Sequence, residues 1–180
     1  MVNFTRAAAA LALAATVSAA PASTTVRATE TTSEITWTVS DFDFHADYIF
    51  TTPAHQNSWG YVNFALSSDK TDLVYSCSTA SNRLSDFFYG ETDYQCTAPE
   101  GAAEGSAASF RYNRTDGTLA LKETVVSGDE TYTASGSTTI QTTCTDETTG
   151  PSPNWEIGQI YIWRKIDCEE VNATVAGTVA

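Results

Sequence analysis

Three carboxylates and an imidazole stand at alternate positions early in the sequence: Asp41, Asp43, His45 and Asp47. In an extended strand, residues two apart point to the same face, so these side chains could gather into one cluster. Carboxylates and imidazoles bind metal ions and also exchange protons in acid–base catalysis. A bend is expected here, however, and the general acidity of the chain is the competing explanation for the cluster.

Other catalytic signatures are weaker. The sequence has no Gly-x-Ser-x-Gly elbow, and its only histidines, His45 and His55, lie in the N-terminal third. The chain has so many acidic residues that carboxylate pairs of the glycosidase type can be found almost anywhere in it. No single pair therefore indicates a glycosidase site. We therefore assign no catalytic residue, expect neither a metal nor a cofactor, and keep a secreted hydrolase that uses acidic residues as a third hypothesis.

The N-terminus has the pattern of a secretory signal peptide. Arg6 precedes the apolar run Ala7–Val17, and Val17-Ser-Ala19 supplies small residues for cleavage. We expect residues 1–19 to be a signal peptide and the Ala-, Thr-, Ser- and Pro-rich residues 20–34 to be a flexible leader. The apolar run is too short to span a bilayer, so the mature protein is expected to be secreted and extracellular.

The sequence is strongly acidic, with 22 Asp and Glu residues against 9 Lys and Arg residues. Removal of residues 1–19 takes away Arg6 and no acid. Such a surface repels phosphate backbones and anionic lipids, so neither nucleic acid nor a membrane is an expected partner. The negative electrostatic potential of this acidic surface favours the approach of a basic protein.

Four cysteines, Cys77, Cys96, Cys144 and Cys168, form an even set that should be fully oxidised in an exported chain. Three connectivities are possible. Sequential pairing, Cys77 with Cys96 and Cys144 with Cys168, closes the shortest loops and so meets the smallest entropic barrier. A zinc site is the alternative, but no two cysteines stand two to four residues apart and neither histidine lies near one.

Period-two alternation predicts strands along most of the remaining chain. Ile35, Trp37 and Val39 alternate with polar residues, as a half-buried strand requires, and Trp37 is expected in the core. Asp116-Gly117 predicts a tight turn before the strand Leu119–Val126, which should belong to an antiparallel meander. These patterns predict an all-β fold, an antiparallel β-barrel or sandwich of about eight to ten short strands with two intrachain disulfides.

We expect one domain over residues 35–168 and a flexible C-terminal tail over residues 169–180. The aromatic segment 82–94 fits either a helix or a strand. Two sequons remain after cleavage, and their asparagines, Asn113 and Asn172, are candidate glycosylation sites.

Four tryptophans and eight tyrosines also suggest a sugar-binding surface, because aromatic faces stack on pyranose rings. Trp155 lies in the Pro-rich loop 151–156 and is the ring that we expect to be most exposed. A carbohydrate-binding module that acts on cell-wall polysaccharide is therefore the second hypothesis.

Six blocks of sequence, in order, resemble the Alternaria major allergen family of secreted fungal proteins. They are Trp37-Thr-Val-Ser-Asp-Phe42, Ser58-Trp-Gly-Tyr-Val-Asn-Phe64, Leu73-Val-Tyr-Ser-Cys77-Ser, Cys96, Thr118-Leu-Ala-Leu121 and Thr131-Tyr-Thr-Ala134. The resemblance spans residues 35–144. It implies a compact β-barrel with two internal disulfides and no established catalytic site, in a family of allergens and elicitors of plant defence.

The resemblance implies a partner as well, either a host plant defence protein or a small phenolic ligand, and the acidity of the chain favours a basic protein. It assigns no ligand-binding residue here. The name-giving members dimerise through an extra cysteine ahead of the first strand, but residues 20–34 contain none, so we expect a monomer or a noncovalent dimer. Their second cysteine pair is also closer together and precedes the final strand, whereas here the predicted strand 159–166 comes before Cys168. The leading hypothesis is a secreted, non-enzymatic protein of this type.

Overall fold

The computed structural model describes residues 33–180, which hold ten β-strands and no helix. The strands are β1 (Glu34–Thr52), β2 (His55–Ser68), β3 (Thr71–Ser81), β4 (Tyr94–Gln95), β5 (Ala107–Asn113), β6 (Thr118–Ser127), β7 (Glu130–Thr139), β8 (Cys144–Thr149), β9 (Ile162–Cys168) and β10 (Val171–Val179). The predicted signal peptide and nearly all of the predicted leader lie outside the described residues. In this part of the chain, no helix is long and apolar enough to cross a bilayer.

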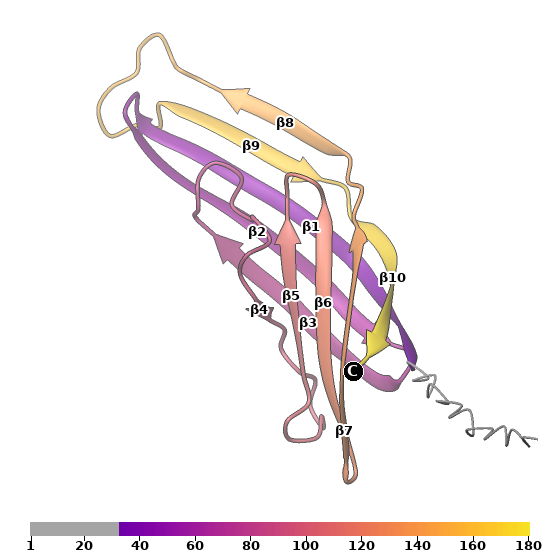
Figure 1. The fold of residues 1–180 in the computed structure, drawn as a ribbon. Coiled ribbons are helices and arrows are strands. Elements are labelled where there is room, and N and C mark those ends of the chain that lie inside the picture. Colours follow the sequence, from indigo (N-terminus) through magenta and orange to yellow (C-terminus); the bar gives the residue numbers. More distant parts are fainter. Residues whose placement is uncertain (1–32) are drawn as a thin grey trace, which may run out of the picture. The chain divides into compact units, whose positions relative to one another are not determined.

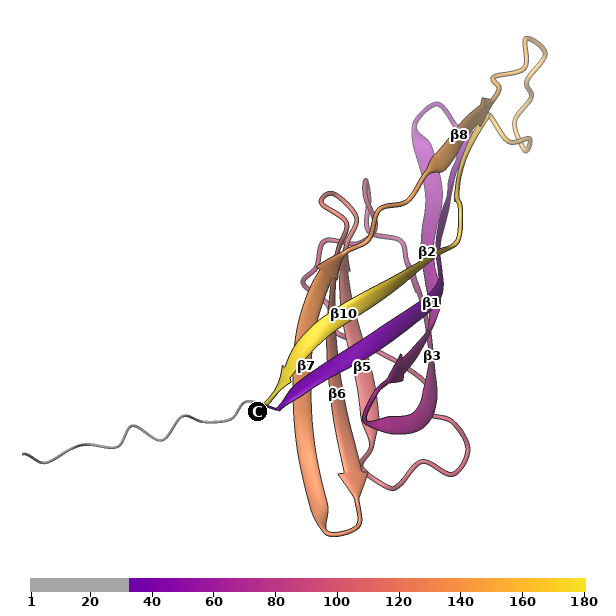
Figure 2. The same cartoon turned by 90° about the vertical axis from the view of Figure 1, so that its right-hand side faces the viewer.

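The strands form one antiparallel sheet that rolls into a nearly closed barrel, the first of the two predicted architectures. Neighbouring strands follow the order β3-β2-β1-β10-β7-β6-β5-β4. The first half of β1 pairs with β10, and its second half pairs with β9, which also pairs with β8. A bulge between Ser40 and Asp43 separates the two halves. In Figure 1, β1, β2 and β9 run obliquely to β5, β6 and β7, and Figure 2 shows β1 and β10 oblique to the same three strands.

Alternation along each strand supplies the core. On β1, Trp37 and Val39 point inward, and the bulge shifts the pattern by one residue so that Phe42 and Phe44 are also buried. The inner faces of β2 and β6 add further apolar side chains, including Val62. Trp37 is therefore a core residue, as the alternation predicted.

Both disulfides follow the sequential pairing, Cys77 with Cys96 and Cys144 with Cys168. The first lies at the seam of the barrel, where β3 meets the chain just after β4. There Ser76 N donates to Thr97 O at 3.0 Å and Thr97 N donates to Ser76 O at 2.7 Å. The second joins residues that face each other on β8 and β9.

The predicted meander is confirmed, because β5, β6 and β7 pair in sequence through turns at Asp116-Gly117 and at 127–130. The ambiguous segment 82–94 is neither a helix nor a long strand. It is a loop that buries Phe87 and Phe88 and ends at Tyr94, the first residue of β4.

The prediction of a flexible tail over residues 169–180 was wrong. Val171–Val179 forms β10, which pairs with β1 on one side and with β7 on the other. The small side chains that suggested a tail are required by packing, because Gly177 lies against the indole of Trp37. The ordered domain therefore extends from Glu34 to Val179, and Glu34, predicted as the end of the leader, begins β1.

Candidate functional site

The structure brings together part of the acidic cluster that the sequence indicated. Asp43, His45 and Asp47 lie on the outer face of β1, whereas Asp41 lies in the bulge with a φ of 54°. His45 Nδ1 lies 2.8 Å from Asp43 Oδ2. Asp47 instead accepts a hydrogen bond from Trp163 Nε1 at 2.7 Å. The four residues therefore do not form a single cluster.

Asp43 and His45 belong to a hydrogen-bonded network across β1, β2 and β3. Asn63 Nδ2 donates to Asp43 Oδ2 at 3.2 Å, and Ser78 Oγ donates to Asn63 Oδ1 at 2.7 Å. The ring of His45 stacks on Tyr61, with centroids 4.8 Å apart. Within residues 33–180, no group of three or more His, Cys, Asp and Glu residues is arranged to hold a metal ion. The network fixes side-chain positions on an open sheet face.

Two tryptophans flank Asp47 on the same outer face. Trp59 lies opposite Asp47 on β2, and Trp163 lies on β9, where its indole reaches Asp47. Their exposed fractions are 43% for Trp59 and 41% for Trp163. We call Trp59, Asp47 and Trp163 the aromatic row. The aromatic row places one apolar ring on each side of a hydrogen-bonding carboxylate.

Trp155, predicted to be the most exposed tryptophan, is only partly exposed. Its ring lies edge-on to Tyr161, and its Nε1 donates to Gln159 O at 3.1 Å, both within the loop between β8 and β9. Proline-rich sequence here marks a loop that Trp155 holds together. The signal that could have found the aromatic row is the alternation on β2, which puts Trp59 and Tyr61 on the face opposite to Val62.

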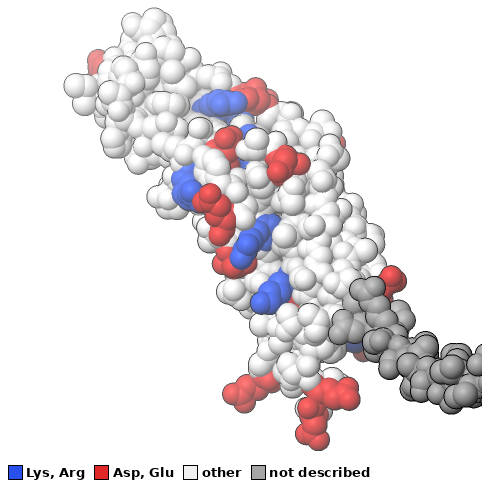
Figure 3. Space-filling model, viewed as in Figure 1, with Lys and Arg blue, Asp and Glu red and all other residues white. Residues whose placement is uncertain are grey.

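Most basic side chains of the described residues are neutralised by a neighbouring acid. Six of the seven Lys and Arg residues in 33–180 form ion pairs: Lys70 with Asp69, Arg83 with Glu91, Arg111 with Asp93, Arg114 with Asp86, Arg164 with Asp146, and Lys165 with Asp167. Figure 3 shows these basic groups interspersed with acids along one face. The pairs leave a surplus of carboxylates elsewhere on the surface.

Part of that surplus gathers at one end of the barrel. Figure 3 shows acidic side chains without basic neighbours at the end where β6 turns into β7 in Figure 1. This turn carries Asp129 and Glu130, and the loop 98–105 beside it carries Glu100 and Glu104, all four exposed. None of the four makes an ion pair with a described residue. We call Glu100, Glu104, Asp129 and Glu130 the acidic end.

The acidic end adjoins a hollow of about 510 Å³. Its walls combine apolar side chains such as Leu73 and Val125 with the polar Glu130 and Tyr132. Tyr132 Oη and Tyr75 Oη are buried and have no hydrogen-bond partner among the described residues. Burial, with a smaller contribution from the nearby carboxylate of Glu123, raises the pKa of Tyr75.

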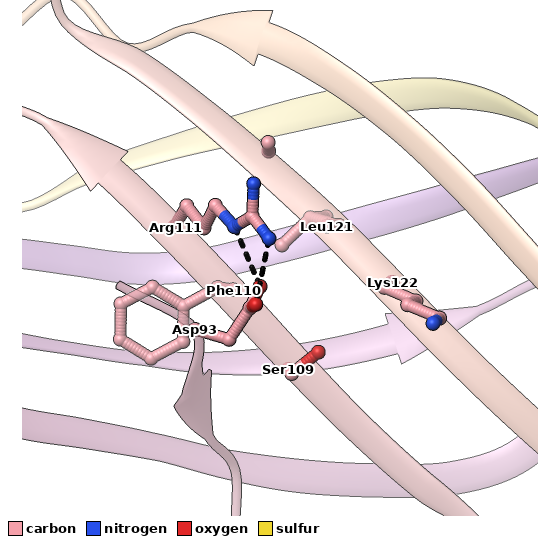
Figure 4. Close-up of a pocket in the computed structure, with 7 residues that line it drawn as sticks. Asp93, Ser109, Phe110, Arg111, Leu121 and Lys122 are labelled. Atoms are coloured by element: carbon pink, nitrogen blue, oxygen red, sulfur yellow. Dashed lines mark hydrogen bonds and ion pairs between the residues drawn. The ribbon is translucent and has the colours of Figure 1, made fainter. Parts of the chain in front are cut away.

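A second, smaller pocket of about 150 Å³ lies on the outer face of β5 and β6, shown in Figure 4. Arg111 donates from Nε and Nη2 to both carboxylate oxygens of Asp93, each at 2.6 Å. The hydrogen bonds from Arg111 lower the pKa of the Asp93 carboxyl below its ordinary value. Lys122, on the neighbouring strand, has no ion-pair partner among the described residues and is the cation that this pocket offers to a ligand.

The two sequon asparagines lie at different kinds of position. Asn113 ends β5 at the hairpin turn, where its Oδ1 accepts from Thr115 N and its Nδ2 donates to Asp116 Oδ2. Asn172 is an exposed residue of β10, and its Oδ1 accepts a hydrogen bond from Asp41 N in the bulge at 2.9 Å. Asn172 therefore belongs to the sheet and not to a tail.

The family description Alternaria alternata allergen 1 (AltA1) matches residues 39–177, which is most of the chain. The chain belongs to the Alternaria alternata allergen 1 family. The AltA1 match includes both disulfides and every strand from β2 to β9, and it ends within β10. It extends beyond the resemblance seen over residues 35–144 and supports an allergen-like fungal protein. No curated protein and no solved structure matches the chain.

The family match confirms the resemblance and clarifies one departure from it. In this AltA1-family chain, the second disulfide joins β8 to β9, and β10 follows it, so the bridge still precedes the final strand. The predicted difference in the order of bridge and final strand arose because residues 169–180 were assigned to a tail, which leaves the predicted difference in cysteine spacing as it was.

Proposed function

We propose that this chain is a secreted, non-enzymatic fungal protein of the effector or elicitor type, which binds a basic defence protein of a plant host. Membership of an allergen family supports the allergen-like part of the proposal. The observation that carries the choice of a basic partner is the acidic end, where four exposed carboxylates form no ion pair with any described residue, although Lys70 lines the adjoining hollow.

The acidic end should affect the rate and specificity of association more than the affinity. Carboxylates concentrated on one end attract a basic surface over a distance and orient it before contact, and such steering raises association rates by roughly 10- to 1,000-fold. Because the acids are exposed, salt screens them, so association should slow markedly as ionic strength rises.

The protein is also proposed to be exported from the cell and to lack a covalent dimer. The N-terminal pattern of residues 1–19 supports secretion, and the pairing of all four cysteines fits an oxidising compartment. Asn113 and Asn172 are proposed glycosylation sites. Without a cysteine ahead of β1, the protein is proposed to be a monomer or a noncovalent dimer.

A small phenolic ligand is the second candidate partner, and the hollow next to the acidic end favours it. Its volume, its apolar walls and the buried hydroxyl of Tyr132 fit a small ring that carries polar groups. Titration with catechol, followed by the chemical shifts of Leu73 and Val125, tests this candidate. Unchanged shifts at millimolar catechol would eliminate the hollow as its site.

The test of the host-protein proposal is affinity capture from plant apoplastic fluid with two variants of equal charge. One neutralises the acidic end with Glu100→Gln, Glu104→Gln, Asp129→Asn and Glu130→Gln. The control neutralises four other exposed acids with Glu147→Gln, Glu156→Gln, Glu169→Gln and Glu170→Gln. We expect the wild type and the control to retain the same basic protein and the acidic-end variant to lose it. Equal retention by both variants would reject the acidic end as the docking site.

A further inference from the structure

The aromatic row offers a second binding surface, away from the acidic end. Trp163 lies opposite Ile49 on β1, and Trp59 lies opposite Asp47, so the two tryptophans are two strands and two residues apart. With strands about 4.8 Å apart and a rise of about 3.3 Å per residue, their Cα atoms are separated by roughly 12 Å. A short run of linked sugar rings covers this span.

The polar groups on this face are already held in place. Trp163 Nε1 donates to Asp47 Oδ1 at 2.7 Å, which orients the indole across β1. In the next row, His45 stacks on Tyr61, and Asp43 is held by His45 and Asn63. Because these side chains are fixed before any ligand arrives, little conformational entropy is lost on binding.

We propose that the aromatic row binds an unsubstituted β-1,4-linked glucan, a neutral and flat polysaccharide. The C–H groups on the faces of such sugar rings pack on the apolar faces of Trp59 and Trp163, both of which are more than 40% exposed. The sugar hydroxyls donate hydrogen bonds to Asp47, a carboxylate with lone pairs to spare after accepting from Trp163. An unsubstituted β-1,4 chain is a ribbon without bulky side groups, so it can lie across the outer faces of β2, β1 and β9.

The mixture of groups on this face disfavours other classes of ligand. Asp43, Asp47 and Asp167 share the outer face and would repel the phosphates of a nucleic acid. The centre of a protein–protein interface is depleted of charged residues, yet here Asp47 separates the two tryptophans and Lys165 lies opposite Asp47. A neutral ligand rich in hydroxyls can use both the rings and the charged groups.

The proposal is tested by titration calorimetry of the full mature chain with cellohexaose. We expect binding by the wild type, and Trp59→Ala and Trp163→Ala should each weaken it at least about tenfold through loss of one stacking surface. Trp155→Ala is the matched control, because Trp155 lies in the β8–β9 loop and contacts Tyr161, and this variant should bind like the wild type. Both row tryptophans are partly exposed and lie outside the core, so each variant should still fold, and its thermal unfolding checks this before the titration.

Variants of Asp47 test whether its hydrogen bond with Trp163 positions the indole for binding. Asp47→Asn keeps an oxygen acceptor for Trp163 Nε1, whereas Asp47→Ala removes it and releases the indole. We expect Asp47→Ala to weaken cellohexaose binding more than Asp47→Asn, and to shift tryptophan emission in the absence of sugar.

Several results would overturn the proposal. They are no heat of binding with cellohexaose, binding by the Trp59→Ala and Trp163→Ala variants as tight as that of the wild type, and binding of chitohexaose as tight as that of cellohexaose. Loss of host-protein capture in Trp59→Ala would instead assign the face to a protein. The acidic-end variant should bind cellohexaose normally, so failure of this proposal and failure of the proposed function can be told apart.

Discussion

Trp37 Nε1 donates a hydrogen bond of 2.7 Å to Glu123 Oε2 inside the barrel, joining two residues 86 positions apart in the sequence. Glu123 is 1% exposed, and its other oxygen has only a long contact of 3.5 Å from Ser68 Oγ. A buried carboxyl group with few donors depends heavily on each one, because an unsatisfied buried polar group costs about 1–3 kcal/mol. This bond connects β1 to β6 across the core.

Trp37→Phe should therefore destabilise the fold by about 3 kcal/mol or more, because it removes the donor to Glu123 and leaves a cavity. Glu123→Gln keeps an oxygen acceptor for the indole and should cost less. The free energy of unfolding in urea, followed by far-ultraviolet circular dichroism, measures both. A greater loss in Glu123→Gln than in Trp37→Phe would mean that this hydrogen bond is not what holds the pair together.

Position 177 must be glycine because the indole of Trp37 occupies the space that a Cβ would need. A Cβ added to Gly177 would collide with the indole and lie 2.6 Å from Ser135 O. Gly177→Ala should lower the free energy of unfolding by about 1–3 kcal/mol, as overpacking of a core does. The exposed neighbour Ala176 provides the control, and Ala176→Ser should change stability by less than about 0.5 kcal/mol. Equal stability of Gly177→Ala and wild type in thermal unfolding would refute the packing argument.

The Cys77–Cys96 disulfide should matter more than Cys144–Cys168. The two bridges span 19 and 24 residues, so loop entropy alone predicts a similar contribution of about 3 kcal/mol from each. The first, however, also holds the barrel seam, where Ser76 and Thr97 exchange two hydrogen bonds.

Replacing both Cys77 and Cys96 by Ala should therefore cost more stability than replacing Cys144 and Cys168. Amide hydrogen exchange at Ser76 and Thr97 should accelerate only in the first double variant, since opening the seam frees the edge of β3. If exchange at the seam is equally slow in both variants, the two hydrogen bonds close the barrel unaided.

The ion pair of Asp93 and Arg111 predicts a specific response to acid. Hydrogen bonds from Arg111 hold the pKa of Asp93 below its ordinary value of 3.8, so in the folded state this carboxylate resists protonation. Its contribution to stability is present above the unfolded-state pKa and is lost as the pH falls through the folded-state pKa.

A carboxyl-detected NMR titration should place the midpoint of Asp93 below 3.8, and Arg111→Gln should return it toward that value. Asp146, which is paired with Arg164, is the internal control, because its pKa is also lowered and should stay low in Arg111→Gln. A midpoint for Asp93 that does not move in the variant would show that Arg111 is not the cause.

Local rules predicted much of the fold. Alternation of Ile35, Trp37 and Val39 assigned the inner face of the first half of β1, and Asp116-Gly117 marked the β5–β6 turn, because side-chain period and turn chemistry depend on neighbours in the sequence. Loop length favoured the sequential disulfides among the three possible connectivities, and the structure has this pairing. What could not be predicted depends on distant partners: β10 is a strand because its small residues fit against Trp37, which the sequence does not show.

The candidate surfaces were predicted less well for the same reason. Asp47 was grouped with Asp43 and His45 by spacing, but its partner is Trp163, 116 residues away. Trp155 was expected to be exposed because of its prolines, yet contacts within its loop cover part of it. The acidic end arises only when the turn at Asp129 meets the loop that carries Glu100 and Glu104.

The association rate with the captured host protein, measured against ionic strength, tests the central claim most directly. For the wild type and for the control with Glu147, Glu156, Glu169 and Glu170 neutralised, we predict a rate constant that falls at least about tenfold between low and physiological salt. For the variant with the acidic end neutralised, we predict a slow rate that hardly depends on salt. The same salt dependence in all three proteins, or none in the wild type, would contradict the account.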